Sequence, residues 1–540
     1  MLAICREASI SLTGRSGWRK PMKRYTWSSI LALALTLGAA GGTGLSPIAG
    51  SSRPDAYARA GQPLILSVPE IRGRTVKVGG MTATIEDIAV TVTIPSSTTP
   101  GRHTLNFVNA ADNLTLTSRE VDVLPPASIA PLQAVEPGKV QLLVNPRLSV
   151  SEADALLNSP AVQAIGKVTT REVLPAAQSK GSPCGGTLAE LKLNPGVSLE
   201  VALNALLQIG GNALWYPDPI STYGAPKQVQ STLPGSAASS NAASSFHYIH
   251  SPVIPRTALG LGAGSTVLKG KGITIAVLDT GFTSSIDSLN ELAGRTDKAM
   301  NALFPFNPQT TFTNAADFWE GHGTQVAILA AGNQHGVATQ ARVLPIKVCA
   351  EGSPGLASCN TRDVLRGLCF ALNQVPARKL VINLSLGGPI PINGIHAVLN
   401  WATSQGVVVV AAGGNQGQTE NLPEFPAAYT QASGSQVGLP MLAVASVTPR
   451  APNIWKYSAF STTGTYLNIS APGEALDIGH PYLYSGTSFA APLVAGAAAL
   501  VKGANLANLP PPAAVRAFML TSSRVLQVQN GKPMLRLSGY

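Results

Sequence analysis

The feature that most constrains the fold is a regular alternation of apolar strands and helical segments in the second half of the chain. The apolar runs are Ile273–Leu278, Leu380–Ser385 and Val407–Ala412. The helix-like segments that alternate with them are residues 324–331, 361–372 and 395–405. Strands that are apolar on both faces are typical of a parallel sheet covered by helices. Residues 251–540 are therefore predicted to form an α/β domain built on a parallel sheet.

A secretory leader is predicted at the amino end, within residues 1–44. The basic pair Lys23–Arg24 precedes the apolar run Ile30–Leu37, and small residues follow as far as Gly44. This order of basic, apolar and small residues is that of a signal peptide, and the apolar run is too short to span a membrane. We therefore expect an exported protein without a stable membrane span, for which Met22 is an alternative start.

The formal net charge of +11 does not indicate nucleic-acid binding. Six basic residues and one acidic residue fall within the first 24 positions, so the leader holds five of the eleven charges. The remaining charges are spread without a basic run, whereas nucleic-acid-binding domains gather theirs on one face. The composition, with 45% hydrophobic and 12% charged residues, is that of a globular protein.

Residues 62–124 are predicted to form a small β-sandwich similar to an immunoglobulin-like module. Short runs alternate polar and apolar residues with a period of two, and turn-forming pairs such as Pro100-Gly101 and Asp112-Asn113 separate them. This spacing of short strands and turns is typical of sandwich domains.

Residues 139–219 are predicted to form a ferredoxin-like α+β unit. Its stretches follow the order β-α-β-β-α-β: Val140–Val144, Ser149–Leu157, Val162–Leu174, Thr187–Leu193, Ser198–Leu207 and Ala213–Tyr216. Pro217-Asp218-Pro219 is expected to end the last strand, because proline cannot donate to a sheet. The Ala/Ser-rich composition of residues 220–250 predicts an exposed linker, a place where proteases cut.

The five cysteines fit an exported protein that packing stabilises in the main. Cys349 and Cys359 bracket a loop rich in glycine, serine and proline, and they are the expected disulfide pair. Cys184 lies in a turn and Cys369 in an apolar segment, and neither receives an assignment. A zinc site is not indicated, because no C-x-x-C pair occurs.

Asp279 directly follows the first buried strand, in the sequence Asp279-Thr280-Gly281. Enzymes with α/β folds place functional groups at this end of a parallel strand, although aspartate is also a common turn residue. An apolar strand followed by D-T-G occurs in aspartic proteases as well. Those enzymes need two such loops to form a carboxyl pair, and the chain has no second D-T-G or D-S-G.

Two further candidates stand at the start of alanine-rich helical segments. His322 lies between two glycines, where its imidazole is poorly packed and able to act as a base near neutral pH. Ser488 follows turn-forming residues and is either a helix N-cap or a nucleophile, since a helix amino end favours developing negative charge. A nucleophilic serine needs a base and a carboxylate that orients the base.

Four motifs, in this order, resemble the signatures of the subtilisin-like serine protease family: V-L-D-T-G, G-H-G-T, V-V-V-V-A-A-G-G-N and S-G-T-S-F-A-A-P. The resemblance covers about residues 265–520 and implies a subtilisin-like catalytic domain that hydrolyses peptide bonds through an acyl-enzyme. It also implies that Asp279 orients the base, His322 is the general base and Ser488 is the nucleophile. The order Asp, His, Ser is the established order in this family.

The same resemblance implies how substrate is held. Asn415 would donate a hydrogen bond to the oxyanion, together with the backbone N–H of Ser488. The segment of Ser385, Leu386 and Gly387 would pair with the backbone of an extended peptide. Gly413 and Gly414 would leave room for a side chain of that peptide. Polypeptides are therefore the expected substrates.

Residues 139–219 resemble the inhibitor-type propeptide of this family, which implies a self-processing zymogen cut in the 217–250 stretch. A permanent accessory domain is the alternative interpretation. No cofactor is required for the implied chemistry. Structural calcium is common in the family, but the sequence contains no ligand cluster to which it can be assigned. The resemblance implies a monomer whose own propeptide is its intramolecular inhibitor.

Two other functions compete with this hypothesis. A binding protein in which the β-sandwich is active and the protease fold inert is disfavoured, because all four candidate catalytic positions are filled. Another serine hydrolase, such as an esterase, is disfavoured because no G-x-S-x-G sequence surrounds Ser488.

Overall fold

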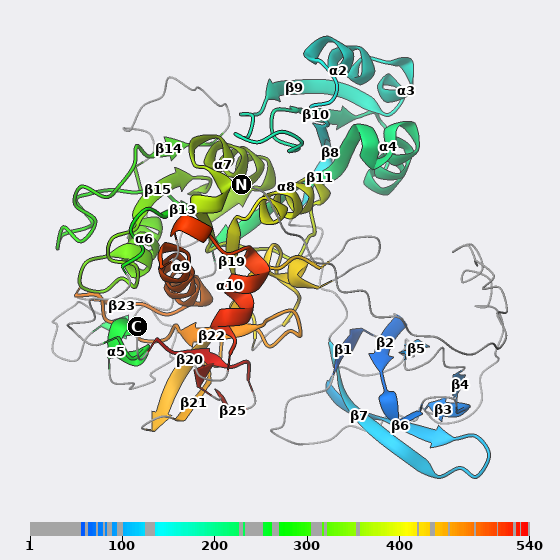
Figure 1. The fold of residues 1–540 in the computed structure, drawn as a ribbon. Helices are drawn as coiled ribbons and strands as arrows, with labels where there is room; N and C mark the ends of the chain where they lie inside the picture. Colours follow the sequence, from blue (N-terminus) through cyan, green and yellow to red (C-terminus); the bar gives the residue numbers. More distant parts are fainter. Residues whose placement is uncertain are drawn as a thin grey trace, which may run out of the picture. The chain divides into compact units, whose positions relative to one another are not determined.

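A computed structural model of the chain divides into two compact units, Met1–Pro125 and Pro126–Tyr540 (Figure 1). The residues that it describes are 56–59, 63–71, 74–78, 81–83, 89–93, 101–124, 135–225, 231–232, 252–261, 269–303, 316–317, 321–352, 357–417, 421–431, 438–451, 454–479, 482–504, 506–521, 525–526, 528–529 and 531–537. Within these ranges no helix is both long enough and apolar enough to cross a membrane. The predicted leader and most of the predicted linker lie outside the described residues.

The first unit contains β-strands that pair mainly in antiparallel fashion. One sheet has the order β1-β7-β6-β3-β4, and β2 pairs with β5 in a second sheet. The elements are β1 (Ala56–Arg59), β2 (Pro63–Ser67), η2 (Pro69–Ile71), β3 (Val76–Val78), β4 (Met81–Ala83), β5 (Ala89–Thr93), β6 (Gly101–Asn109) and β7 (Thr115–Leu124). The strands agree with the alternating pattern of this region, while the immunoglobulin-like identity of the unit remains a prediction.

The second unit begins with a βαββαβ segment that matches the predicted element order. Its elements are β8 (Val135–Val144), α2 (Val150–Leu157), α3 (Pro160–Gln163), β9 (Gly166–Val173), β10 (Thr187–Leu193), α4 (Leu199–Leu214) and β11 (Trp215–Ala225). The strands lie in the order β11-β8-β10-β9, and all three pairings are antiparallel. α2 begins at a capping box in which Ser149 and Glu152 satisfy each other's backbone N–H groups.

The prediction that Pro217-Asp218-Pro219 ends the last strand is wrong, because β11 continues to Ala225. At both prolines β11 pairs with β8 only, since its second neighbour, β17 (Ala357–Asn360), joins from Thr222 onward. One edge of β11 therefore has no partner strand at these positions, and proline is tolerated in strands with an open edge. As a result, the strand extends from the βαββαβ segment into the α/β part of the unit, where β17 also pairs with β16 (Ala350–Glu351).

The largest sheet has the predicted parallel core. Its order is β14-β15-β13-β18-β19-β20-β22-β26-β24. The parallel members are β13 (Thr274–Asp279), β14 (Met300–Asn301), β15 (Arg342–Lys347), β18 (Leu380–Leu384), β19 (Val408–Ala412), β20 (Leu442–Ala451) and β22 (Ile469–Pro472). From β13 the chain proceeds to β15 on one side and later to β18 on the other. Open α/β sheets bind ligands at the carboxyl ends of the strands beside such a reversal, which are here the ends of β13 and β18.

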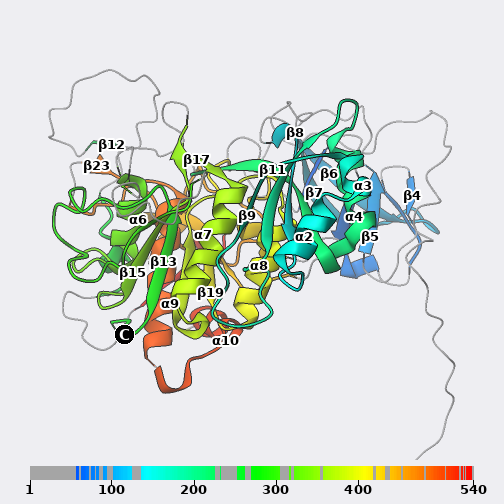
Figure 2. The same ribbon diagram turned by 90° about the horizontal axis from the view of Figure 1, so that it is seen from above.

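Helices cover both faces of this sheet (Figures 1 and 2). α6 (His322–Ala331) and α9 (Thr487–Gly503) pack against each other and against one face, whereas α7 (Thr361–Gln374) and α8 (Asn393–Ser404) pack on the other. The smaller elements are β12 (Ser231–Thr232), α5 (Pro255–Ala258), η5 (Ala377–Lys379), η6 (Ala427–Thr430), β21 (Ile454–Tyr457), β23 (Tyr482–Leu483), η7 (Leu506–Asn508), α10 (Pro512–Met519), β24 (Val525–Leu526), β25 (Val528–Gln529) and β26 (Met534–Leu535).

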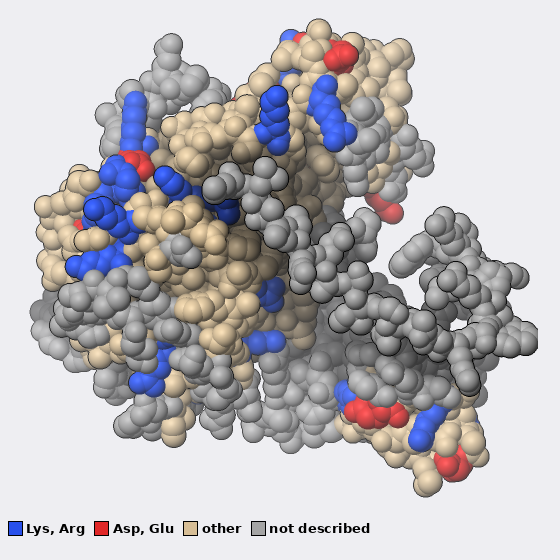
Figure 3. Space-filling model, viewed as in Figure 1, with Lys and Arg blue, Asp and Glu red and all other residues tan. Residues whose placement is uncertain are grey.

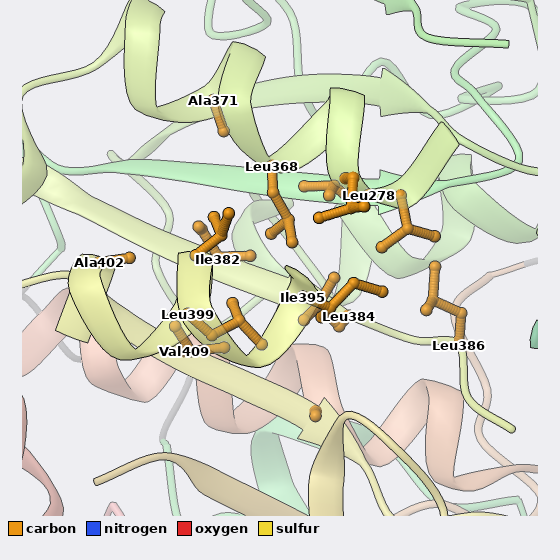
Figure 4. Close-up of a cluster of buried hydrophobic side chains, with 14 of the residues drawn as sticks. Leu278, Leu368, Ala371, Ile382, Leu384, Leu386, Ile395, Leu399, Ala402 and Val409 are labelled. Carbon is orange, nitrogen blue, oxygen red and sulfur yellow. The ribbon is translucent and has the colours of Figure 1, made fainter. Parts of the chain in front are cut away.

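The two helical layers create two apolar cores, one on each face of the sheet. Figure 4 shows the core beneath α7 and α8, where leucine, isoleucine and alanine side chains of both helices meet those of β13, β18 and β19. Burial of this apolar surface contributes the main stabilisation, at roughly 25 cal/mol per Å². The cores fix the strand ends that carry the candidate site residues.

Two disulfides lie in the second unit. Cys349 and Cys359 are joined, and they enclose the loop next to β17. The second disulfide joins Cys184, which lies in the loop between β9 and β10, to Cys369 in α7. It links positions 185 residues apart and connects the βαββαβ segment covalently to the α/β part.

Basic side chains do not form one continuous patch on the face shown in Figure 3. They lie in separate groups among uncharged residues.

Candidate active site

Asp279 is the last residue of β13 and lies at the reversal point of the sheet. It is 1% exposed, and its Oδ1 accepts hydrogen bonds from the backbone N–H of Thr280 at 2.7 Å and from the imidazole of His322. Burial at the end of a strand holds the carboxylate in one orientation. It can therefore fix the orientation of the imidazole.

His322 is the first residue of α6 and is completely buried. Its Nδ1 donates to Asp279 Oδ1 across 2.6 Å, which leaves Nε2 free to accept a proton. Gly323 allows this close approach, because a Cβ at that position would lie 2.4 Å from the carbonyl oxygen of Gly281. Two residues that are 43 positions apart are thus brought into direct contact.

Electrostatics favour the protonated form of His322. Burial lowers the pKa of its imidazole, but the charge and hydrogen bond of Asp279 raise it, and the charge of Asp317 adds to the rise, so the net direction is upward. A base with a raised pKa accepts a proton more readily. The imidazole is therefore suited to take a proton from a hydroxyl group.

Asp317 is a part of this site that the sequence prediction missed. One of its carboxylate oxygens accepts from the hydroxyl of Thr280 at 2.6 Å, and the other accepts from the N–H and hydroxyl of Thr324. It thereby ties the end of β13 to the first turn of α6. The available signal was a carboxylate five positions before His322, which is too common a spacing to single out.

Ser488 lies in the first turn of α9 and is 1% exposed. Its Oγ has no hydrogen-bond partner among the described residues, and neither has Nε2 of His322, so these two atoms are not bonded to each other. The next residue, Phe489, packs its ring against the imidazole with centroids 5.2 Å apart. This contact holds the amino end of α9 beside His322.

Asn415 follows β19 and is oriented by the residue that precedes Ser488. Its Oδ1 accepts from both the backbone N–H and the hydroxyl of Thr487, at 2.9 and 2.8 Å. These bonds fix which end of the amide faces α9. Its Nδ2 is buried and has no partner within the described part of the chain. An amide donor and a serine hydroxyl are thus both left available at the amino end of α9.

The segment after β18 contacts both Ser488 and the chain's own β11. Ser385 donates its hydroxyl hydrogen to the carbonyl oxygen of Ser488 at 2.7 Å, and Leu386 is completely buried. Gly387 exchanges two backbone hydrogen bonds with Gly224 of β11, at 2.8 and 3.0 Å in an antiparallel bridge. The backbone of this segment therefore pairs with an extended strand.

Gly413 and Gly414 lie directly before Asn415 and are both buried. The carbonyl oxygen of Gly413 accepts a hydrogen bond from the hydroxyl of Tyr466 at 2.7 Å, which fixes the backbone in place. Gly414 has a φ of +104°, a conformation that favours glycine. A Cβ at Gly414 would also lie 2.3 Å from Glu424 Cγ, so the residue could not carry a side chain without displacing Glu424.

The described residues contain no group of three or more His, Cys, Asp or Glu side chains arranged to hold a metal ion. The chemistry available to the site comes from the side chains and backbone groups described above.

Comparisons with known proteins agree with this arrangement. The subtilase family model matches residues 270–539. The chain is 33% identical to thermitase of Thermoactinomyces vulgaris over 256 residues, which are 45% of this chain and 80% of thermitase. It is 36% identical to subtilisin BL of Lederbergia lenta over 247 residues, which are 44% of this chain and 79% of that protein.

A solved structure extends the likeness in fold beyond the matched domain. The structure of fervidolysin from Fervidobacterium pennivorans, a keratinolytic enzyme related to subtilisin, aligns with a TM-score of 0.51 and 20% identity. The alignment covers 74% of this chain and 60% of fervidolysin. The family model matches half of the chain, and the alignments cover about four fifths of thermitase and of subtilisin BL. The chain therefore belongs to the subtilase family and is a subtilisin-like serine endopeptidase.

Proposed function

We propose that this protein is an exported endopeptidase, made as a self-processing zymogen, in which Ser488 is the nucleophile, His322 the general base and Asp279 the residue that orients the base. The observation that carries the assignment is the buried contact between His322 Nδ1 and Asp279 Oδ1 at 2.6 Å. Beside it, His322 Nε2, Ser488 Oγ and Asn415 Nδ2 are buried polar atoms without a partner among the described residues. Such atoms are costly unless a substrate completes their hydrogen bonds.

The reaction uses these atoms in turn. His322 Nε2 takes the proton of Ser488 Oγ while the oxygen bonds to the peptide carbonyl carbon, and Asn415 Nδ2 and the backbone N–H of Ser488 donate to the resulting oxyanion. The C–N bond then breaks, and His322 passes the proton to the leaving amine. Water attacks the acyl-enzyme by the same route and releases the acid. A hydrogen bond between Ser488 Oγ and His322 Nε2 must form before this proton transfer, since neither atom has a partner among the described residues.

The zymogen proposal rests on β11. This strand leaves the βαββαβ segment and occupies the backbone positions of Gly387 that a substrate strand would take. A chain held there as an antiparallel strand blocks substrate and brings its own following residues toward Ser488. We place the cut after Ala225, within residues 226–250, because the paired part of β11 ends at Ala225. The permanent accessory domain remains the competing interpretation.

Export is supported by the leader sequence and the disulfides. Disulfides persist in oxidising compartments, and the second unit contains two of them. Among the relatives, one from Bacillus subtilis is named the major intracellular serine protease, so family membership alone does not decide the compartment.

The test is labelling of the full chain with a fluorophosphonate, followed by amino-terminal sequencing of the secreted protein. We expect Ser488 to be labelled, and we expect the reduced wild-type protein to yield a fragment that begins within residues 226–251, whereas Ser488→Ala remains uncut in this stretch. Labelling that persists in Ser488→Ala would refute the assignment of the nucleophile. Identical amino termini in the two proteins would refute self-processing. Turnover of simple esters without turnover of casein would favour the esterase alternative.

A further inference from the structure

The buried carboxyl group of Glu424 lies between the two glycine-containing segments that we propose bind substrate. On one side, the next residue, Phe425, exchanges two backbone hydrogen bonds with Gly388, at 2.8 and 3.0 Å. A Cβ at Gly387 would lie 2.9 Å from Glu424 Oε2, and a Cβ at Gly414 would lie 2.3 Å from Glu424 Cγ. The space beside both glycines is therefore the space that this side chain occupies.

Glu424 has no counter-charge among the described residues. It is 5% exposed, and its Oε2 has no hydrogen-bond partner there. Burial raises the pKa of its carboxyl group to about 8, an effect that a hydrogen bond from Gln416 only partly opposes. An acidic group buried without a cation is costly to a fold and is more often found at functional sites than elsewhere.

The position of Glu424 relative to the reacting atoms determines which part of a substrate it meets. Gly414 directly precedes Asn415, whose Nδ2 would bind the oxygen of the scissile carbonyl. A peptide with its carbonyl there places the side chain of the same residue against the Gly413–Gly414 segment. Glu424 lies against that segment, at Gly414. A long side chain with a terminal cation would therefore extend toward its carboxyl group.

We propose that Glu424 makes the enzyme selective for peptides with lysine or arginine immediately before the scissile bond. The ammonium or guanidinium group supplies the missing partner of Oε2 and donates a charge-assisted hydrogen bond to it. Gly387 and Gly414 add no side chain of their own beside this carboxyl group. The inference rests on the proposed function, because it uses Asn415 and Ser488 to place the scissile bond.

The first test compares wild-type enzyme on peptides that differ in one residue. Lysine and norleucine have side chains of similar length and shape, but only lysine carries a charge. We expect kcat/KM to be at least about tenfold higher with lysine or arginine before the scissile bond than with norleucine or leucine. Equal or higher kcat/KM with norleucine would overturn the inference. This comparison needs no variant, so it does not depend on how a substitution affects folding.

The second test is Glu424→Gln, which keeps the size of the side chain but cannot ionise to pair with a cation. The ratio of kcat/KM for lysine over norleucine should fall at least about tenfold in this variant. Glu351→Gln, which removes an exposed carboxylate of β16, is the matched control and should keep the wild-type ratio. A ratio unchanged in Glu424→Gln, or lowered equally in Glu351→Gln, would contradict the assignment.

The outcomes also separate this inference from the proposed function. If Ser488 is labelled by a fluorophosphonate and the norleucine peptide is cleaved best, the inference fails and the proposed mechanism stands. If Ser488 is not labelled and none of the peptides is cleaved by protein whose linker has been cut, the proposed function fails, and the inference falls with it.

Discussion

At the scale of single residues, the site is defined by polar atoms that lack partners. Proteins pair nearly all of their buried polar groups, so several unpaired atoms in one place need an explanation. His322 Nε2, Ser488 Oγ and Asn415 Nδ2 are such atoms, and all three belong to residues that touch the amino end of α9 or lie in it. An incoming peptide carbonyl would accept a hydrogen bond from Asn415 Nδ2 and react with Ser488 Oγ, whose proton would pass to His322 Nε2.

Asn415 allows this explanation to be tested. Removing one oxyanion donor lowers kcat by about 10²–10³-fold, a size established with subtilisin itself. We expect a loss of this size in both Asn415→Ala and Asn415→Asp, with little change in KM. The aspartate variant keeps an oxygen for Thr487 but has no N–H to donate. Recovery of activity in Asn415→Asp, measured with a peptide substrate, would show that only the bonds to Thr487 matter.

At the scale of elements, sequence periodicity predicted the strands and helices that carry the site. Asp279, His322 and Ser488 lie at the strand end and helix starts where turn chemistry and apolar runs placed them. The predictions failed where pairing between distant segments decides the structure. Whether prolines end β11 depends on which edge of the strand has a neighbour, and that neighbour, β17, is more than a hundred residues away. The local sequence around β11 does not indicate that β17 pairs with it.

The same limit explains the residues that were missed. Asp317 bonds to Thr280, and Glu424 lies beside Gly387, and each of these neighbours is 37 positions away in sequence. Cys184 and Cys369 received no assignment because nothing in either local sequence identifies its partner. The four motifs were found because each one combines a reactive residue with the glycines or helix start that position it.

Helix α8 provides a prediction at this scale, because its amino end is capped by β11. The Asp218 carboxylate accepts hydrogen bonds from the N–H groups of Asn393 and Gly394 at 2.6 and 2.7 Å. Burial raises the pKa of Asp218 from 3.8 to about 7, although those hydrogen bonds oppose the rise. An acid with a raised pKa binds its proton more tightly in the folded state. Its contribution to stability is therefore complete below about pH 4 and is lost as the pH rises through about 7.

The measurement compares Ser488→Ala protein with and without Asp218→Asn, because the asparagine does not titrate. Between pH 5 and pH 8, the protein with Asp218 should lose more of its unfolding free energy, by about 3 kcal/mol, because only the two pH units between 5 and the raised pKa of about 7 contribute. Thermal unfolding at the two pH values would detect the difference. If both proteins lose the same unfolding free energy between the two pH values, Asp218 does not titrate as its burial predicts.

At the scale of the whole molecule, the βαββαβ segment and the α/β part share more than one kind of contact. Arg366 of α7 is completely buried and bonds to Glu172 of β9, and Arg362 pairs with Glu190 of β10 at 2.8 Å. β11 continues directly into the α/β part. The contacts of a dissociable inhibitor and those of a permanent domain are alike in kind, so the covalent connections decide how the two parts behave after a cut.

The disulfide between Cys184 and Cys369 leads to a whole-molecule prediction. A cut within residues 226–250 should yield one band of full mass on a gel without reductant and two bands with it. In the double variant Cys184→Ser/Cys369→Ser, the two fragments should separate without reductant. Fragments of the wild-type protein that separate under non-reducing conditions would contradict the prediction.

Because this disulfide tethers the two fragments, processing alone would not release the inhibitory fragment. A severed inhibitor normally escapes by diffusion, and dilution then favours the free enzyme. Here the severed piece would stay at an effective concentration in the millimolar range and would rebind however far the sample is diluted. Breaking the peptide chain once would not be enough for activation. Activation would also require a thiol reductant or further digestion of the tethered fragment.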